Sequence, residues 1–514
     1  MHTPTVRRLR SVLASNALLL AIGLLAVGVG TELARPFQSA SIAFDSQSTV
    51  LYFERIITGQ RLEAFVPTTP KPLMSVVFGT LFEVTHDWRT LAWLTIAVNA
   101  LAIAATAALA GRFGGAIAAA FVGVGLINNG SLLFDVGFAL ATPYALLGLA
   151  IAGLAIARER PRYGVAGIAL GVAVLARLET LVLVGTLFAA LAGRWTWALR
   201  THQAAPPARA WLVPAIALAA IPIMMGHDAL LTGDPFNWTR VSVELSAHRV
   251  NQLRTATQIA VQLGERYLAI GAVSLLAIVG FVRLVIDRRY WLATALVGLS
   301  LGVGTFLVLL GLRHLVVPIR YAAVIDVAVI FAAGIGLTQL SIAVLERAPI
   351  ARFVERLRED RSSLPAAVAA GAVAIVLLQP YFLADRSLRS AVRKNLTVFV
   401  ATDRAIPAVR EALAHSCVVA TPAARVLVPG SIWPRVAVDL GMKLTDVAVT
   451  APTKIDVAAG YPAPCQVVLH IRAADLVTPA WSALEVSRPT QTGEATVAPV
   501  LADPSAGVWV VAIR

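Results

Sequence analysis

A carboxylate and an ammonium group share the polar segment 32–89, which separates the first two apolar stretches of the chain. Asp45 follows apolar residues, and Lys71 stands in the turn Thr69-Pro70-Lys71-Pro72. Charge beside hydrocarbon is costly and usually functional. A carboxylate there is suited to take a proton from a hydroxyl group, and a lysine in a proline-stiffened turn is suited to bind a phosphate. Structural explanations stay open for both, because Asp45 could cap a helix and Lys71 could extend to lipid headgroups.

The residues after Asp45 have the spacing of an amphipathic helix. Apolar and polar side chains follow one another with a helical period through Tyr52-Phe53-Glu54-Arg55-Ile56-Ile57. We therefore expect a short helix that lies along the membrane surface and ends near Gly59. Tyr52 and Glu54 on this helix are candidate substrate-binding residues.

Two opposite charges interrupt the apolar block 164–193, at Arg177-Leu178-Glu179. A single lipid-facing helix would place both charges at the centre of the bilayer, so we predict two shorter helices that meet at this tripeptide. A guanidinium at a helix break suits the phosphate of a lipid-linked substrate. An ion pair that holds the two half-helices together explains the same residues.

Further polar side chains gather on two other segments. They are Arg313, His314, Arg320 and Tyr321 in the turn 313–321, and His227, Asp228, Asp234, Asn237 and Trp238 in the segment 227–238. The first group suits an anionic headgroup, as a substrate site or as a membrane anchor. The second supplies carboxylates and an aromatic ring on which a sugar can stack, although its composition is also that of an ordinary turn.

The composition indicates a polytopic α-helical membrane protein. Hydrophobic residues make up 58% of the chain and charged residues 14%, and the mean hydropathy is +0.76, well outside the range of soluble domains. A helix needs about 20 apolar residues to cross a bilayer. Suitable runs occur near 11–31, 90–110, 114–127, 133–157, 164–193, 210–231, 267–286, 291–312, 321–345 and 364–384. Splitting the fifth run at Arg177 predicts about eleven transmembrane helices.

The arginines predict the orientation. With eleven spans, the basic connections all fall on one side, which the positive-inside rule assigns to the cytoplasm together with the N-terminus. Inside-facing arginines and anionic lipid then account for much of the net charge of +14, so no nucleic-acid partner is needed. We expect a multi-pass protein of the inner (plasma) membrane. The N-terminal segment also resembles a secretory signal with a weak cleavage motif at Ser39-Ala40-Ser41, which an uncleaved first helix makes unnecessary.

The composition changes at residue 385, where charged residues and prolines return. We divide the chain into a transmembrane domain, 1–384, and an extracytoplasmic α/β domain, 385–514, with a helix over 402–415 and strands over 417–420, 425–428 and 466–471. Cys417 and Cys465 lie beside predicted strands, and an oxidising compartment favours a disulfide over two free thiols. The sequence has no zinc-site spacing, no phosphate-binding Gly-rich loop and no repeat of fixed period.

The order of these features resembles the GT-C superfamily of membrane glycosyltransferases, over residues 11–345 and in layout rather than in a strict motif. The matching positions are Asp45 in the first outer loop, the helix over 52–59, the turn 69–73, Arg177-Leu178-Glu179, Gly233-Asp234-Pro235 with Asn237, and Arg320-Tyr321. The chain departs from the family where many relatives carry a paired acidic motif, because Ser46 and Gln47 follow Asp45. It also has Leu178 where Arg-Pro-Glu is usual.

The resemblance implies an inverting glycosyltransferase that moves a sugar from a polyprenyl-phosphate donor to a cell-envelope glycan or glycolipid on the outer face. Arabinofuranosyl- and mannosyltransferases of actinobacterial envelopes are the nearest look-alikes. Asp45 would be the catalytic base. Lys71, Arg177, Arg313, His314 and Arg320 would bind the donor phosphate, and Tyr52, Glu54, Glu179, His227, Asp228, Asp234, Asn237, Trp238 and Tyr321 would bind sugar or acceptor.

The resemblance implies no cofactor with certainty and leaves a divalent cation, Mg²⁺ or Mn²⁺, open. Two other functions also stay open. A flippase or transporter of lipid-linked sugars would use intramembrane charges as well, but it often has inverted repeats, and the sequence shows none. A non-catalytic scaffold of envelope assembly could keep the same layout without activity, and the missing second acidic residue after Asp45 fits such a scaffold.

Overall fold

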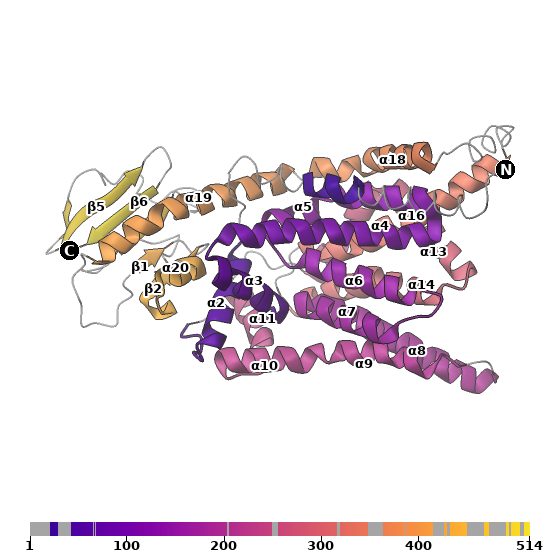
Figure 1. Cartoon of the computed structure of the whole chain (residues 1–514), viewed down its shortest axis with the longest axis horizontal. Coiled ribbons are helices and arrows are strands. Elements are labelled where there is room, and N and C mark those ends of the chain that lie inside the picture. Colours follow the sequence, from indigo (N-terminus) through magenta and orange to yellow (C-terminus); the bar gives the residue numbers. More distant parts are fainter. Residues whose placement is uncertain are drawn as a thin grey trace.

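The protein is described by a computed structural model, in which long helices run side by side and a small β-sheet lies at one end (Figure 1). The structure describes residues 21–28, 43–64, 66, 68–202, 205–248, 255–315, 319–347, 363–384, 386–414, 426–428, 432–449, 467–471, 490–492, 495–503 and 508–513. Cys417 and Cys465 lie outside these residues, so the disulfide stays a prediction.

The helices follow the apolar blocks of the sequence. In chain order they are α2 (Phe44–Ile57), α3 (Pro72–Thr85), α4 (Trp88–Ile127), α5 (Gly130–Gly137), α6 (Thr142–Ile156), α7 (Tyr163–Ala176), η2 (Leu178–Thr180), α8 (Leu181–Thr201), α9 (Leu212–Leu218), α10 (Ala220–Thr232), α11 (Asn237–His248), α12 (Ala256–Ala269), α13 (Gly271–Ile286), α14 (Tyr290–Val297), η5 (Gly298–Gly302), α15 (Val303–Leu312), η6 (Ile319–Ala322), α16 (Ala323–Arg347), α18 (Ser363–Ala384), α19 (Arg386–Ala414) and α20 (Trp433–Leu440).

The 40-residue helix α4 reverses direction in its middle. A straight helix of that length would measure about 60 Å, twice the apolar thickness of a bilayer. Gly115 breaks it with φ 65° and ψ −158°, a conformation open mainly to glycine. A Cβ placed on Gly111 would lie 3.3 Å from Cβ of Ala119, whereas a straight helix would separate these residues by about 12 Å. The two halves therefore pack side by side, and they match the separate runs predicted over 90–110 and 114–127.

The predicted break at Arg177 is present. Helix α7 ends at Ala176, Arg177 is extended with φ −144° and ψ 112°, and a single 3-10 turn, η2, leads into α8. The segment 227–238 is not the ordinary turn that its composition allowed, because α10 continues to Thr232 and α11 begins at Asn237. His227 and Asp228 consequently lie inside α10 rather than in a turn.

Helix length and composition identify a multi-pass membrane protein. Five described helices are long and apolar enough to cross a bilayer, and the bent pair Ala256–Ala269 and Gly271–Ile286 raises the number to six if it counts as one span. Shorter apolar helices include Pro72–Thr85, Thr142–Ile156 and Tyr163–Ala176. The expected number of about eleven is therefore not confirmed, because several predicted spans form helices of only about 20 Å.

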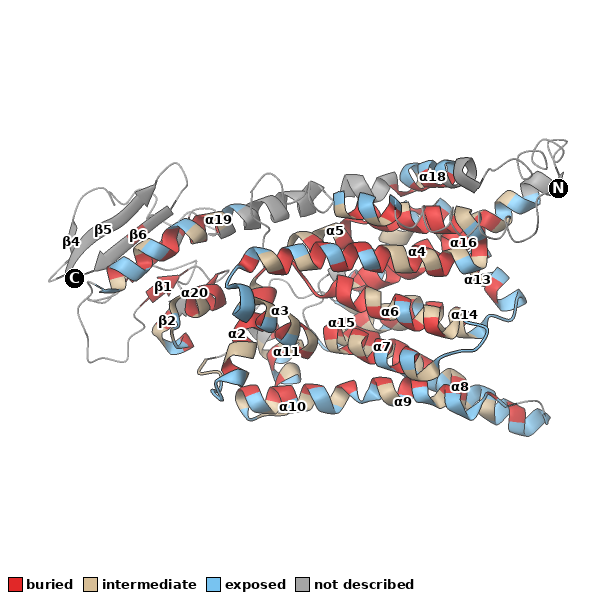
Figure 2. Ribbon diagram, viewed as in Figure 1, coloured by how far each residue is buried: buried red, intermediate tan, exposed pale blue. Residues whose placement is uncertain are grey.

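The core lies on α4, α6 and α16, while exposed side chains extend along α8 (Figure 2). In the most apolar stretch of α16, 78% of the residues are buried inside the protein. In the most apolar stretch of the span 178–201, which contains α8, only 28% are buried. The lipid bilayer would cover the rest of the second helix. Helix α16 is thus a central element, and α8 is a peripheral one that leaves much of its apolar surface for lipid.

A six-stranded sheet forms the C-terminal part of the chain. Its strands are β1 (Val426–Val428), β2 (Val447–Val449), β3 (Val467–Ile471), β4 (Thr490–Thr492), β5 (Ala495–Asp503) and β6 (Val508–Ile513), in the order β2-β1-β3-β6-β5-β4. Strand β1 pairs in parallel with β2 and β3, and the other pairs are antiparallel. The predicted strands near 425–428 and 466–471 are present, and 417–420 lies outside the described residues. The helix expected over 402–415 is longer than predicted, because α19 already begins at Arg386.

The sheet and its helices pack directly on α2. Leu51 and Tyr52 of α2 share one buried apolar cluster with residues of α19, α20 and the sheet. Arg55 donates from Nη2 to the carbonyl of Met442 over 2.9 Å. Trp88 Nε1 donates to Asp439 Oδ1 over 2.7 Å. The helix that carries Asp45 is therefore held from behind by the C-terminal part of the chain.

Candidate active site

Six of the residues predicted from the sequence line one cavity of about 360 Å³. They are Asp45, Lys71, Arg177, Glu179, Trp238 and Tyr321. These residues come from α2, the start of α3, the break between α7 and α8, α11, and η6, which precedes α16. The walls between them are apolar and include Leu140, Val174 and Phe306. Charged groups thus converge on a space that is otherwise lined by hydrocarbon.

Asp45 and Lys71 face each other across this cavity. Helix α2 begins at Phe44, earlier than the expected start at Tyr52, so Asp45 sits in its first turn, where the helix dipole favours an anion. The N-cap is Ala43 without a side-chain hydrogen bond, so Asp45 is not the cap that the structural explanation required. Lys71 is the N-cap residue of α3. Its Nζ lies 3.6 Å from Asp45 Oδ2, and both side chains are about a quarter exposed.

Arg177 lies in a buried network with two carboxylates. Its Nε donates to Glu179 Oε1 over 2.5 Å, and Nη1 lies 3.3 Å from Asp135 Oδ2. Thr142 bridges the two by hydrogen bonds with Arg177 and Asp135. Asp135 is fully buried, and Arg177 and Glu179 are 6% and 8% exposed. A guanidinium with two carboxylate partners is held rigidly. Arg177 therefore forms the structural ion pair with Glu179 and also lines the cavity.

Two aromatic side chains complete the cavity. The ring of Tyr321 lies against Arg177, with 4.9 Å between the guanidinium carbon and the ring centroid, which is a cation–π contact. Trp238 is partly buried, and its backbone N–H donates to Asp228 Oδ2 over 2.7 Å. Asp228 therefore acts on the cavity through the position of Trp238, without lining it.

Tyr52 and His227 lie behind the cavity wall. The Tyr52 hydroxyl donates to the carbonyl of Thr68 over 2.9 Å, and Thr68 lines the cavity. Burial, followed by the charges of Asp45 and Asp228, raises the pKa of Tyr52 well above its ordinary value. The rings of Tyr52 and His227 meet edge to face at 6.4 Å. These contacts make Tyr52 a support for the cavity wall.

The remaining predicted residues are not brought to the cavity. Glu54 pairs with Arg55 on α2. Burial raises the pKa of Glu54, the positive charge of Arg55 partly opposes this shift, and the negative charges of Glu83 and Glu63 add to it. Asp234 and Asn237 form local hydrogen bonds at the turn between α10 and α11. Arg313 and His314 are exposed after α15 and are absent from the lining. The side chain of Arg320 lies outside the described part of the structure.

The sequence reasoning missed Asp135 and a second buried carboxylate, Asp326. Asp326 on α16 accepts hydrogen bonds from Arg266 Nε at 3.1 Å, from the Tyr267 hydroxyl at 2.9 Å and from Asn129 Nδ2 at 3.2 Å. This network ties α12 and α5 to the central helix α16. The signal in the sequence was a lone carboxylate within an apolar block, which needs a buried partner.

No cluster of three or more His, Cys, Asp or Glu side chains able to hold a metal ion occurs among the described residues. The group beside Asp45 is the ammonium of Lys71, a neighbour that disfavours a bound cation. The residues present therefore do not fit a resident divalent cation at Asp45.

The fold and the cavity define a multi-pass membrane protein with a charged cavity among its helices. Its fold is similar to that of ArnT from Cupriavidus metallidurans, solved bound to undecaprenyl phosphate, with a TM-score of 0.51 and 13% identity over 96% of this chain and 97% of that one. The oligosaccharyltransferase AglB from Archaeoglobus fulgidus, solved with an inhibitory peptide and a dolichol-phosphate, gives a TM-score of 0.48 and 11% identity over 83% and 64% of the two chains. No protein-family model and no curated protein sequence matches the chain. The likeness to ArnT shows a shared fold.

Proposed function

We propose that the protein is an inverting glycosyltransferase that takes a sugar from a polyprenyl-phosphate donor. One observation carries the proposal. Asp45, Lys71 and Arg177 line a single cavity whose remaining wall is largely apolar. This arrangement combines a proton acceptor and two cations with an apolar surface for a lipid. ArnT, which has a similar fold, was solved bound to undecaprenyl phosphate, which supports a donor of this class.

The proposed reaction is one displacement at the anomeric carbon. The acceptor hydroxyl attacks from the face opposite the phosphate, its O–H bond breaks, and Asp45 takes the proton. The new glycosidic C–O bond forms as the sugar–phosphate C–O bond breaks, and the electron pair leaves on the phosphate. Lys71 and Arg177 stabilise the charge that grows there. Attack from the opposite face inverts the anomeric configuration.

Because Lys71 and Asp45 form an ion pair, donor binding also affects Asp45. A phosphate that binds Lys71 competes with the carboxylate 3.6 Å away, so donor binding frees Asp45 to face the acceptor. Tyr321 and Trp238 offer aromatic surfaces against which a sugar ring packs. Asp135 and Glu179 hold the guanidinium of Arg177 in place and act as positioning residues.

The finer assignment rests on the layout of the sequence. We propose arabinofuranose or mannose as the sugar, a cell-envelope glycan or glycolipid as the acceptor, and the outer face of the membrane as the location. By the positive-inside rule, the basic connections of the sequence favour that face for the cavity. The C-terminal sheet packs on α2 and would lie outside the membrane, where it could position the acceptor.

The test is sugar transfer by the purified full-length chain in lipid nanodiscs. The donors are synthetic polyprenyl-phosphate arabinofuranose and polyprenyl-phosphate mannose, and the acceptors are short envelope glycans. We expect transfer from one donor, with inversion read by NMR of the product. Tight binding of polyprenyl phosphate with no transfer from any donor would overturn the proposed glycosyltransferase activity and favour a flippase or transporter. Neither binding nor transfer would favour a scaffold.

A further inference from the structure

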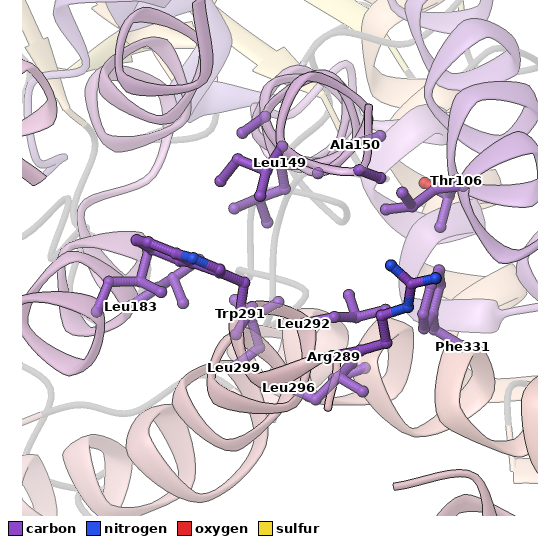
Figure 3. A pocket seen from close by; sticks show the side chains of 18 of the residues that line it. Thr106, Leu149, Ala150, Leu183, Arg289, Trp291, Leu292, Leu296, Leu299 and Phe331 are labelled. Atoms are coloured by element: carbon purple, nitrogen blue, oxygen red, sulfur yellow. The ribbon is translucent and has the colours of Figure 1, made fainter. Parts of the chain in front are cut away.

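A second cavity, of about 240 Å³, lies farther along the helical bundle from Arg177 and is the deeper one when viewed from the candidate active site (Figure 3). Its walls come from α4, α6, α7, α8, α14 and α16, and they are made of aliphatic side chains such as Leu149, Leu183, Leu296 and Leu299. Thr106 is the labelled side chain that carries an oxygen, and its hydroxyl donates to the carbonyl of Ala102 within its own helix. Apart from the polar groups of Arg288, Arg289 and Trp291 at one edge, the described walls therefore offer a hydrocarbon chain good contacts and a polar group few partners.

Arg289 and Trp291 line one edge of this cavity at the start of α14, and Figure 3 shows their side chains extending to opposite sides of it. The Arg289 guanidinium lies 5.8 Å from the ring centroid of Phe113. The Arg194 guanidinium lies 5.2 Å from the ring centroid of Tyr290. Both arginines are exposed. Aromatic rings beside exposed arginines are typical of the level at which a protein meets lipid headgroups.

A basic surface depression adjoins the same edge. It shares Ala157 with the cavity and is lined by Arg112, Arg158, Arg160 and Arg162, with Glu159 as the acidic residue among them. Nη1 of Arg112 lies 3.4 Å from the carbonyl of Ala157, which ties the depression to the wall of the cavity. An apolar interior thus continues into a strongly positive rim, which consists of these arginines together with Arg289, which lines the cavity, and Arg194, which lies over the lining residue Tyr290.

The two cavities belong to different levels of the bundle. Along α7, Leu170 lines the deeper cavity and Val174 lines the one with Arg177. Along the α14–α15 stretch, Arg289 and Trp291 belong to the deeper cavity, whereas Phe306 and Leu310 belong to the other. The positive rim is therefore at the end away from Arg177, on the face that the arginines assign to the cytoplasm.

We propose that the deeper cavity binds an anionic phospholipid of the cytoplasmic leaflet. One acyl chain occupies the aliphatic interior, and the headgroup phosphate lies among the arginines of the rim. Charge complementarity selects this occupant, because the inner leaflet supplies anionic lipid and a zwitterionic lipid would gain little from these guanidinium groups. The proposal goes beyond the glycosyl transfer and does not depend on it.

The test is native mass spectrometry of the purified full-length chain, titrated separately with phosphatidylglycerol and phosphatidylcholine. We expect phosphatidylglycerol to bind at least tenfold more tightly. The double variant Arg194→Gln/Arg289→Gln should bind it about 30-fold more weakly, at roughly fivefold for each arginine at an anionic surface. Arg200→Gln is the matched control, because Arg200 is an exposed arginine on the same helix as Arg194 and lies outside the rim. It should bind as wild type does.

A second variant reports on the interior. Ala150 is 3% exposed and faces the cavity in Figure 3, so Ala150→Leu should displace part of the acyl chain and weaken phosphatidylglycerol binding about tenfold or more. Equal binding of the two phospholipids, or no effect of the double arginine variant, would overturn the proposal. So would competition by polyprenyl phosphate at this site, because the cavity would then hold the far end of a donor tail.

Discussion

Replacing Asp45 by asparagine should have opposite effects on catalysis and on donor binding. The amide keeps the size of the side chain but cannot take a proton from the acceptor. A positioned general base contributes typically a factor of about 10² to 10⁴ to the rate, which corresponds to roughly 3–5 kcal/mol of transition-state stabilisation. We therefore expect the rate of transfer from the bound donor to fall by that factor.

Donor binding should improve slightly in the same variant. Lys71 Nζ lies 3.6 Å from the carboxylate that the substitution neutralises, so the phosphate no longer competes with that charge for the ammonium. Both side chains are about a quarter exposed, and a partly exposed pair of this kind contributes about 1 kcal/mol or less. Polyprenyl phosphate should accordingly bind up to about fivefold more tightly.

The two effects are measured separately in nanodiscs. Single-turnover transfer reports the chemical step, and equilibrium binding of polyprenyl phosphate reports affinity. Lys71→Met should weaken both. Asp87→Asn is a matched control, because Asp87 is an exposed carboxylate that caps α4 from outside the cavity and asparagine caps equally well. A parallel loss of binding and transfer in Asp45→Asn would refute a general base at this position.

Three further outcomes follow from the packing. Arg177→Met removes the cation that Glu179 and Asp135 share. The free energy of unfolding should therefore fall by about 3–5 kcal/mol, as measured by thermal unfolding in detergent. Asp439→Asn removes the charge that accepts a hydrogen bond from Trp88, and we expect a loss of about 1–3 kcal/mol together with faster proteolysis of the C-terminal sheet. The pKa of Glu54 is raised above its ordinary value of 4.5, so the folded state holds a proton that the unfolded state releases. Stability should then fall as the pH rises above about 4.5 through the raised pKa, and Glu54→Gln should flatten that slope in unfolding midpoints measured between pH 5 and 8.

The apolar runs of the sequence predicted most of the apolar helices, because a segment that crosses a bilayer must satisfy its own backbone hydrogen bonds. The charged tripeptide at Arg177 predicted the break between α7 and α8, since neither half could carry both charges through lipid. The same reasoning predicted about eleven spans, a number that the described helices do not confirm. Helices α6 and α7 are surrounded by protein on several sides, and a helix buried in this way need not match the thickness of the bilayer.

The candidate site was predictable only in part, because its geometry depends on long-range contacts. Asp45, Lys71 and Arg177 stood out as charges in apolar surroundings, and they do line one cavity. Arg313 and His314 carried the same signal and are exposed elsewhere. Nothing local distinguishes the two cases. One of the two carboxylate partners of Arg177 lies 42 positions away at Asp135, a separation that no spacing rule in a single sequence reveals.

The position of Asp45 depends on the far end of the chain. Helix α2 presents Asp45 to the cavity at its first turn and buries Leu51 and Tyr52 against the C-terminal sheet and its helices. Arg55, one turn beyond Tyr52, is anchored to the carbonyl of Met442. An isolated helix of 14 residues has only marginal stability in water. The packing against the C-terminal sheet therefore stabilises α2 and fixes its orientation toward the cavity. Changes that loosen the C-terminal sheet should therefore lower the transfer rate without touching a residue of the cavity.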